Sequence, residues 1–286
     1  MHLKIGISAD STCDLPLAYA KDHGITVLPL YVIKEDGSSY RDGVDISTPD
    51  VFAYTEATGK ITGTSAVTVG DYIETWTEMK KEYDVIIHVA FSSELSACCS
   101  NARIAAAEFE NIRVVDSRNL TTGYGHLALD AVEMVKNGLT PDEIVAELER
   151  KIPCVESSFM LDTLEYMRRG GRCTTVQALG ANMLKLKPCI EVHDGKMHVA
   201  KKYRGRIERA YLQYVRDRLA GRSDLDLRRI FITDSGIPED MYESVRAAIL
   251  SYQPFEEVIR TSTGCTVSSH CGPMTMGILY MRKPEN

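Results

Sequence analysis

The sequence predicts an α/β protein of two domains, an N-terminal domain with a parallel sheet between helices and a C-terminal domain with a mixed sheet. In the first half, short β-branched and apolar segments alternate with segments of helical spacing, as in successive βαβ units. Residues 85–91 form a nearly continuous apolar run, typical of a strand covered on both faces of a parallel sheet. Asp194-Gly195 lies between the strand-like residues 188–192 and 197–200 and indicates a hairpin, which a parallel sheet lacks.

The first half of the chain has clear signals at the helix starts. Pro16 and Pro49 stand at early helical positions, where a missing N–H does no harm. Thr140 forms a capping box with Glu143, and apolar residues recur at helical spacing behind Thr68. The expected elements are, in order, a strand at 3–8, a helix at 15–21, a strand at 25–33, helices at 48–58 and 68–79, the strand at 85–91, a helix at 96–109, a strand at 112–115, and helices at 122–136 and 140–150.

The pattern changes near Pro153, and we therefore divide the chain there. Residues 1–153 are the expected N-terminal α/β domain, and residues 154–286 the C-terminal α/β domain with the mixed sheet. His270 is expected in a turn before the last strand. The expected elements are a strand at 157–161, a helix ending at Gly170-Gly171, a helix at 175–185, strands at 188–192 and 197–200, a helix at 207–219, a strand at 229–233, a helix at 239–252, and strands at 257–260 and 276–281.

Composition narrows the class of protein. The 286 residues are 44% hydrophobic and carry a net charge of -7, which argues against broad nucleic-acid binding because that needs a basic surface. No apolar run approaches the roughly 20 residues that span a bilayer, so we expect a cytoplasmic protein without a transmembrane segment, although transient membrane contact stays compatible with the sequence. The eight cysteines are scattered without a C-x-x-C motif, so we expect reduced cysteines, no metal and no cofactor.

Hydroxyl side chains are concentrated in two segments, residues 62–65 (TGTS) and residues 92–96 (SSELS), each shortly before an amphipathic helix. A helix start exposes unpaired backbone N–H groups and carries partial positive charge, so hydroxyls there can help to bind a carboxylate or phosphate. The alternative is that Thr68 and Ser96 are ordinary N-caps, each worth about 1 kcal/mol of helix stability. Together the two segments predict a paired anion site.

Seven segments carry a family resemblance over essentially the whole chain. In this order they resemble the DegV family of bacterial fatty-acid-binding proteins. The resemblance implies the two domains described above, with a long-chain fatty acid enclosed between them. The segments are residues 9–16 (ADSTCDLP), 64–65 (TS), 92–96 (SSELS), 115–117 (VDS), 164–172 (LEYMRRGGR), 186–188 (LKP) and 270–273 (HCGP).

The same resemblance implies a site for the carboxylate of an acid such as palmitate. Thr64 and Ser96 are expected to hold it, with His270 as their partner. Two departures from the family concern the pocket around them: residues 66–67 are Ala-Val where the family usually has Gln-Pro, and residues 97–99 are Ala-Cys-Cys where it usually has Gly-Thr-Tyr. The residues expected to support the pocket are Ser65, Ser93, Arg172 and Gly272.

The resemblance also implies a role in lipid metabolism. Bacterial relatives serve a fatty acid kinase, so the chain is expected to present its acid to a separate ATP-dependent subunit that forms acyl phosphate. The sequence has no G-x-x-x-x-G-K-[ST] motif and no G-x-G-x-x-G after a strand, so phosphoryl transfer belongs to the partner and the chain itself is expected not to be an enzyme. Arg204 is the residue expected to contact the partner or the phosphoryl group.

Two alternatives stay open from the residues. The first is a serine-dependent acyl-ester hydrolase built from Ser96, His270 and Asp116, although the chain lacks the G-x-S-x-G elbow. The second is a lipid-responsive protein that regulates a partner.

Overall fold

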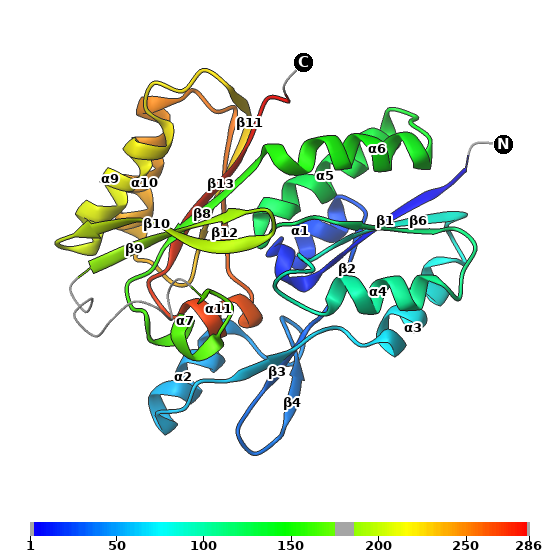
Figure 1. Cartoon of the computed structure of the whole chain (residues 1–286), viewed down its shortest axis with the longest axis horizontal. Helices are drawn as coiled ribbons and strands as arrows, with labels where there is room; N and C mark the ends of the chain where they lie inside the picture. The colour runs from blue at the N-terminus through cyan, green and yellow to red at the C-terminus, as the bar shows by residue number, and fades with distance from the viewer. Residues whose placement is uncertain (1–2, 175–185, 285–286) are drawn as a thin grey trace.

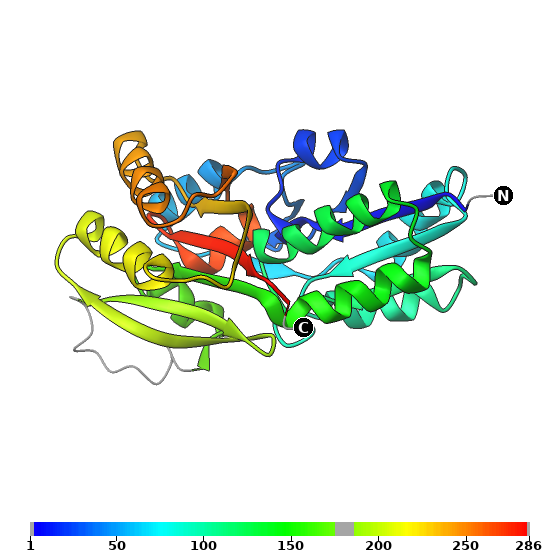
Figure 2. The same cartoon turned by 90° about the horizontal axis from the view of Figure 1, so that it is seen from above.

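The computed structural model describes residues 3–174 and 186–284, in which two larger sheets follow one another along the molecule (Figures 1 and 2). The first sheet is parallel throughout, in the order β2-β1-β6-β7. The predicted parallel sheet is thereby confirmed. The expected helix at 175–185 lies outside the described residues. The four strands are β1 (Ile5–Asp10), β2 (Ile25–Leu28), β6 (Val85–Ala90) and β7 (Ile112–Asp116).

Helices cover both faces of the parallel sheet (Figure 1). Every residue of β6 is buried, as its continuous apolar run predicts. Thr140 and Glu143 form the predicted capping box of α6. On one face lie α5 (Thr122–Lys136) and α6 (Pro141–Lys151), and on the other α3 (Val69–Met79) and α4 (Cys98–Ala106), while α1 (Leu17–Asp22) connects β1 to β2.

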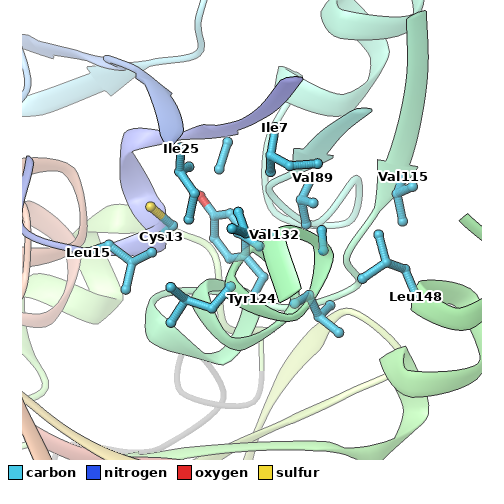
Figure 3. Packing of buried hydrophobic residues seen from close by; sticks show 14 of the residues in the cluster. Ile7, Cys13, Leu15, Ile25, Val89, Val115, Tyr124, Val132 and Leu148 are labelled. Carbon is cyan, nitrogen blue, oxygen red and sulfur yellow. The ribbon is translucent and has the colours of Figure 1, made fainter. Parts of the chain in front are cut away.

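One core cluster joins this sheet to α5 and reaches beyond it. Figure 3 shows Ile7, Val89 and Val115 of the sheet packed with Tyr124 of α5. The Tyr124 hydroxyl donates to the carbonyl of Asp10 at 2.8 Å, so the ring is buried without an unpaired polar group. The same cluster continues into β8, β11 and β13 of the second sheet. The two halves of the chain therefore share a packed core.

The second sheet is mixed, as predicted, in the order β10-β9-β8-β13-β11-β12. Its pairs are antiparallel except β11 with β12. The predicted hairpin joins β9 to β10 at Asp194 and Gly195, which both have positive φ, as the tight turn requires. The strands are β8 (Val155–Met160), β9 (Leu186–His193), β10 (Lys196–Arg204), β11 (Leu225–Asp234), β12 (Glu257–Ser262) and β13 (Met276–Arg282), with α9 (Ile207–Leu219) and α10 (Glu239–Tyr252) packed on them.

The sheets change near the proposed domain boundary at residue 153. The short helix η2 (Ile152–Cys154) lies there, the parallel sheet uses strands before it, and the mixed sheet uses strands after it. We therefore retain residue 153 as the proposed boundary.

A small antiparallel sheet, in the order β4-β3-β5, was not predicted. The expected strand at 25–33 is two strands in different sheets, because Pro29 between them offers no N–H to a ladder. The segment 62–65, expected as the approach to a helix, contributes the third strand. The strands are β3 (Tyr31–Ile33), β4 (Ser39–Arg41) and β5 (Gly63–Ser65). Helix α2 (Thr48–Thr58) lies between β4 and β5 in the chain, and the short helix η1 (Ser11–Cys13) follows β1.

Two short helices, α7 (Glu165–Gly170) and α11 (Cys265–Cys271), lie together between the mixed sheet and the small sheet (Figure 1). The prediction of a turn around His270 was wrong, because the residue lies in the last turn of α11. This helix is seven residues long and has no side-chain cap of its own, so the local sequence gave no helix signal. Among the described residues, no helix is long and apolar enough to cross a membrane.

Candidate functional site

A cavity of about 450 Å³ lies between the three sheets, within the roughly 300 to 1,000 Å³ typical of small-molecule sites. Thr12 and Phe91 in its wall follow the carboxyl ends of β1 and β6. In the order β2-β1-β6-β7, the chain leaves β1 toward β2 on one side and leaves β6 toward β7 on the other. Ligands of open α/β sheets bind where the connections diverge in this way. The mixed sheet supplies the opposite wall, including Phe159 and Gly277. The cavity therefore draws on both halves of the chain.

Most of the cavity wall is hydrocarbon. Aliphatic, aromatic and thioether side chains come from segments that flank the small and parallel sheets, from α3, α7 and α11, and from the mixed sheet. Such a wall gains free energy by covering an apolar ligand, because it removes hydrocarbon surface from water. Its apolar members are Leu30, Ala66, Val69, Phe91, Leu95, Ala97, Leu120, Phe159, Met167, Met197, Val267, Cys271 and Leu279.

Two of the predicted carboxylate ligands are in direct contact with each other through one hydrogen bond. Thr64 stands on β5 opposite Val32, and its Oγ1 lies 2.8 Å from Nε2 of His270. Ser96 lies in the same cavity wall just before α4, where its Oγ accepts from the backbone N of Cys98 at 3.2 Å. The structure thus brings three predicted residues, 206 positions apart at most, to one cavity.

The starts of two helices lie beside these hydroxyls. Thr68 is the N-cap of α3, as the alternative interpretation held, and it also lines the cavity. The N-cap of α4 is Ala97 rather than Ser96. Ser96 stands one position before this N-cap, and its Oγ accepts the amide of Cys98, the first residue of α4. Asn101 ties α4 to the start of α3 by donating to the Val67 carbonyl at 2.8 Å. The start of α4 favours negative charge in this part of the cavity, because a helix N-terminus carries partial positive charge. The start of α3 already has an acidic partner, since the Asp71 carboxylate accepts from Thr68 in a capping box.

The His270 imidazole is neutral near pH 7. Loss of hydration and the nearby charge of Arg172 lower its pKa to about 4. Its Nδ1 atom is buried and has no hydrogen-bond partner among the described residues. Gly170 lies directly against that atom, since a Cβ at this position would come within 2.2 Å of it. We assign the ring proton to Nε2, which then donates to Thr64 and leaves the Thr64 hydroxyl proton free for a ligand oxygen.

The remaining predicted residues divide into two groups. Ser65 and Arg172 belong to the cavity wall, and Arg172 is exposed and donates to the Gly170 carbonyl at 2.7 Å. Ser93, Gly272 and Arg204 are not part of that wall as far as the described residues define it.

Those three residues have other surroundings. The Ser93 amide donates to Asp116 at 3.2 Å. Gly272 ends α11 with φ of 78°, and a Cβ there would meet the Tyr166 ring at 2.5 Å. Arg204 is exposed at the end of β10, opposite Leu186. Arg204 is therefore accessible to a partner protein.

Sequence reasoning missed two carboxylates that hold α11 in place. Asp14 Oδ1 accepts the Gly264 amide at 2.8 Å, and Asp42 accepts the amides of Cys265 at 2.7 Å and Thr266 at 3.0 Å. Burial, together with the nearby Asp42 charge, raises the pKa of Asp14 well above its usual range. Asp14 stands in the family segment 9–16, but only the fold reveals its partner.

The arrangement needed for a serine hydrolase is not formed by the described residues. A catalytic triad requires a carboxylate at the second nitrogen of the histidine, and the Nδ1 of His270 has no such partner. Asp116 instead accepts the amides of Ser93 and Arg118 and lies outside the cavity wall. The geometry gives the hydrolase alternative no support.

The family profile described as "Uncharacterised protein, DegV family" matches residues 4–283. The chain belongs to the DegV family. A DegV domain-containing protein of Caldanaerobacter subterraneus is 31% identical over 283 residues, which cover 98% of this chain and 99% of that protein. The resemblance found in the seven sequence segments is thereby confirmed.

Solved DegV structures share the fold over nearly the whole chain. A fatty-acid-binding DegV family protein from Thermus thermophilus has a TM-score of 0.87 at 31% identity and covers 98% of this chain and 100% of its own. DegV of Bacillus subtilis, a fatty acid binding protein, has a TM-score of 0.83 at 26% identity with the same coverage. The DegV fold of this chain therefore has the architecture of proteins named for fatty acid binding.

Proposed function

We propose that this DegV protein binds a long-chain fatty acid such as palmitate in the cavity, with the carboxylate held by Thr64, Ser96 and His270. The observation that supports this is the division of the wall, which is mostly hydrocarbon but gathers hydroxyls and two helix starts around one histidine. Two similar structures, from Thermus thermophilus and Bacillus subtilis, are of proteins named for fatty acid binding.

The energetics assign different tasks to the tail and the head group. A 16-carbon tail that leaves water gains on the order of 0.8 kcal/mol per CH₂, roughly 10 kcal/mol before the costs of association are subtracted. A carboxylate, by contrast, gives up its hydration and needs donors in return. The tail therefore supplies most of the affinity, and Thr64, Ser96 and the start of α4 mainly set the orientation.

The protein is, on this proposal, a non-catalytic carrier that presents its acid to a separate ATP-dependent fatty acid kinase subunit for conversion to acyl phosphate. The sequence lacks the phosphate-binding loop motifs that would hold ATP. Arg172 is exposed beside His270, and the exposed Arg204 would contact the partner or the phosphoryl group, where cations stabilise the charge that develops during transfer.

Native mass spectrometry followed by lipid extraction tests the binding. We expect one fatty acid per chain after purification, and rebinding of added palmitate after delipidation. The Thr64→Val, Ser96→Ala double variant should bind it more weakly than wild type, whereas Ser93→Ala, outside the described wall, should not. No acyl mass in the purified protein and no binding of added palmitate would rule the proposal out.

Acyl-phosphate formation with a kinase subunit and ATP tests the second half of the proposal. Arg204→Ala should keep palmitate affinity within a few-fold and sharply reduce transfer, while Lys202→Ala, also exposed on β10, should change neither. Parallel loss of binding and transfer would assign Arg204 to the pocket or the fold. Normal binding with no transfer in wild type would favour the regulatory alternative.

A further inference from the structure

The segment 92–96, which carries Ser96, is covered by an element from the other half of the chain. The turn between β9 and β10 reaches over to the half that contains the parallel sheet (Figures 1 and 2). Ser92 is buried beneath this turn, and its Oγ donates to the carbonyl of Gly195 at 2.9 Å. The turn of the mixed sheet is therefore bonded directly to the segment that supplies a proposed carboxylate ligand.

Ser92 also holds the backbone of this segment in shape. Its carbonyl accepts the amide of Leu95 at 3.0 Å and the amide of Ser96 at 3.2 Å, which closes the chain into a tight turn. Its own amide donates to the carbonyl of Asn119 at 3.1 Å, and its Oγ accepts the amide of Glu94 at 3.3 Å. A shift of Ser92 would therefore move Ser96, because a backbone hydrogen bond joins the two residues.

Charged side chains join the same two parts at the surface. Arg118 donates to the carbonyl of Asp194 in the turn and to Glu94 of the segment, the latter at 3.1 Å. Lys196, on the other side of the turn, pairs with Glu94 at 3.3 Å. These pairs are partly exposed, and pairs of this kind contribute little because water screens them. The buried bond from Ser92 is therefore the main link between the turn and the segment.

Gly195 makes the close approach of the turn possible. Its φ is 80°, and a Cβ at this position would lie 2.7 Å from the Ser92 Oγ and 3.0 Å from the guanidinium carbon of Arg118. A side chain there would displace the Ser92 hydroxyl. Met197, two positions later on β10, belongs to one core cluster with Leu95, and both line the cavity. The turn and this part of the cavity wall therefore pack as one unit.

We infer that the β9–β10 turn positions Ser96 for the ligand carboxylate, with Ser92 and Gly195 as the positioning residues. The inference rests on the proposed function, which places the carboxylate at Ser96, and it adds that the C-terminal half is needed to hold Ser96 in place. Ser92 is outside the cavity wall that the described residues form, so its effect on a ligand passes through Ser96. Loss of its hydroxyl should therefore weaken binding of a charged head group and leave the tail contacts unchanged.

Affinities of the delipidated protein for palmitic acid and for hexadecanol, its uncharged analogue with an equally long chain, test the inference. Ser92→Ala should weaken binding of palmitic acid by about threefold to fivefold, close to the value of one hydrogen bond, and change hexadecanol affinity by less than about twofold. In a Ser96→Ala background it should add little to the loss, because both changes act on one contact. Ser100→Ala, an exposed serine of α4, is the control and should bind both ligands like wild type.

Gly195→Ala tests the turn from its own side. The added Cβ should displace the Ser92 hydroxyl, so affinity for palmitic acid should fall about as far as in Ser92→Ala, again without a loss for hexadecanol. Gly138→Ala is the matched control, because Gly138 has almost the same φ, 79°, whereas a Cβ there meets no atom within 4 Å. It carries the same backbone strain and should keep both affinities.

Each other outcome overturns the inference in a distinguishable way. Equal losses for palmitic acid and hexadecanol in Ser92→Ala would mean that Ser92 supports the cavity as a whole. Losses that add up fully in the double variant with Ser96→Ala would mean that Ser92 does not act through Ser96. Unchanged affinities in Ser92→Ala would show that the turn has no part in binding, and the fatty-acid function would stand. Failure of wild type to bind palmitic acid would overturn the proposed function as well. Gly195→Ala gives the same comparison if Ser92→Ala does not fold.

Discussion

Helix α11 is held at its two ends in different ways. At its first turn, two buried carboxyl groups accept three backbone amides: Asp14 binds Gly264, and Asp42 binds Cys265 and Thr266. These bonds link elements more than 200 positions apart in sequence. They satisfy amides that a short helix without its own cap leaves unpaired. The first turn is thus a fixed support supplied by the N-terminal half.

At the last turn the bonds to the N-terminal half come from side chains rather than from backbone amides. Ser269 bonds to Thr62 at 2.7 Å and His270 to Thr64 at 2.8 Å, while Nδ1 of His270 has no partner among the described residues. On the proposed function, a ligand carboxylate would change the pairing at this end, while the amide bonds of the first turn would stay in place. On the proposed function, the fixed support lies at one end of this short helix and the ligand contact at the other, and the predictions below test that separation.

The largest expected effect is the loss of the support at the first turn. Asp42→Asn keeps the shape but leaves one acceptor for two amides, so it should lower the free energy of unfolding by about 4 kcal/mol. Asp45→Asn is the control, because Asp45 pairs with Arg41 on the surface, where such pairs contribute about 0 to 1 kcal/mol. Urea unfolding of the three proteins measures the difference. Equal losses in both variants would mean that Asp42 is no special support.

The two ends should also respond oppositely to pH. The folded-state pKa of His270 is lowered to about 4 from an ordinary 6.5, so the unfolded chain binds the proton first as pH falls. The contribution of the uncharged His270 to stability is therefore complete above pH 6.5. Between pH 6.5 and pH 4 the free energy of unfolding of wild type should fall by about 3 kcal/mol relative to that of His270→Asn. His126, whose pKa burial also lowers to about 4, is present in both proteins and cancels. Parallel urea-unfolding curves across this window would show that His270 is not held uncharged.

The contribution of Asp14 to stability changes with pH in the opposite direction. Burial raises the folded-state pKa of Asp14 well above 3.8, so its contribution is complete below that pH and is lost as pH rises through the folded value. Asp14→Asn, which stays uncharged, should therefore gain stability relative to wild type as pH increases. A difference that does not change with pH would mean that Asp14 stays ionised in the folded protein.

The elements that sequence predicted best are those whose signals are local. The start of α6 was predicted because Thr140 and Glu143 are three residues apart, and β6 because its apolar run is continuous. The small sheet was missed because its strands have three residues each, which is too short to show the alternation of apolar and polar residues typical of a strand. Helix α11 was missed because its stability comes from Asp42, 223 positions earlier. No local pattern encodes such a contact.

The same distinction applies to the site. Hydroxyls near helix starts and the family resemblance identified Thr64, Ser96 and His270 as candidates from sequence. The bonds from Asp14 and Asp42 to the first turn of α11 could not be predicted, because they join residues more than 200 positions apart in sequence. Gly170 was interpreted only as part of a helix end, although its lack of a side chain makes room for the imidazole.

Gly170→Ala tests how tightly the last turn is packed. The added Cβ would lie 2.2 Å from Nδ1 of His270, so the ring must move away from Thr64. Such overpacking costs roughly 1 to 3 kcal/mol, and we expect about 2 kcal/mol lower stability together with weaker palmitate binding. Gly70→Ala on α3 is the control, since a Cβ there meets nothing closer than 3.7 Å. Unchanged stability and affinity in Gly170→Ala would show that the ring can shift freely.

The smallest expected effect is at the ligand itself. Thr64→Val removes the hydroxyl that lies between His270 and the proposed carboxylate, yet it leaves the tail contacts intact. Palmitate affinity should fall by about 1 kcal/mol, the value of one hydrogen bond, and stability should change less than in Asp42→Asn. Adding Ser96→Ala should give less than the sum of the two single losses, because both hydroxyls serve one ligand. Calorimetric titration with palmitate measures all three variants. Wild-type affinity in the double variant would place the carboxylate elsewhere in the cavity, and α11 would then be a support at both of its ends.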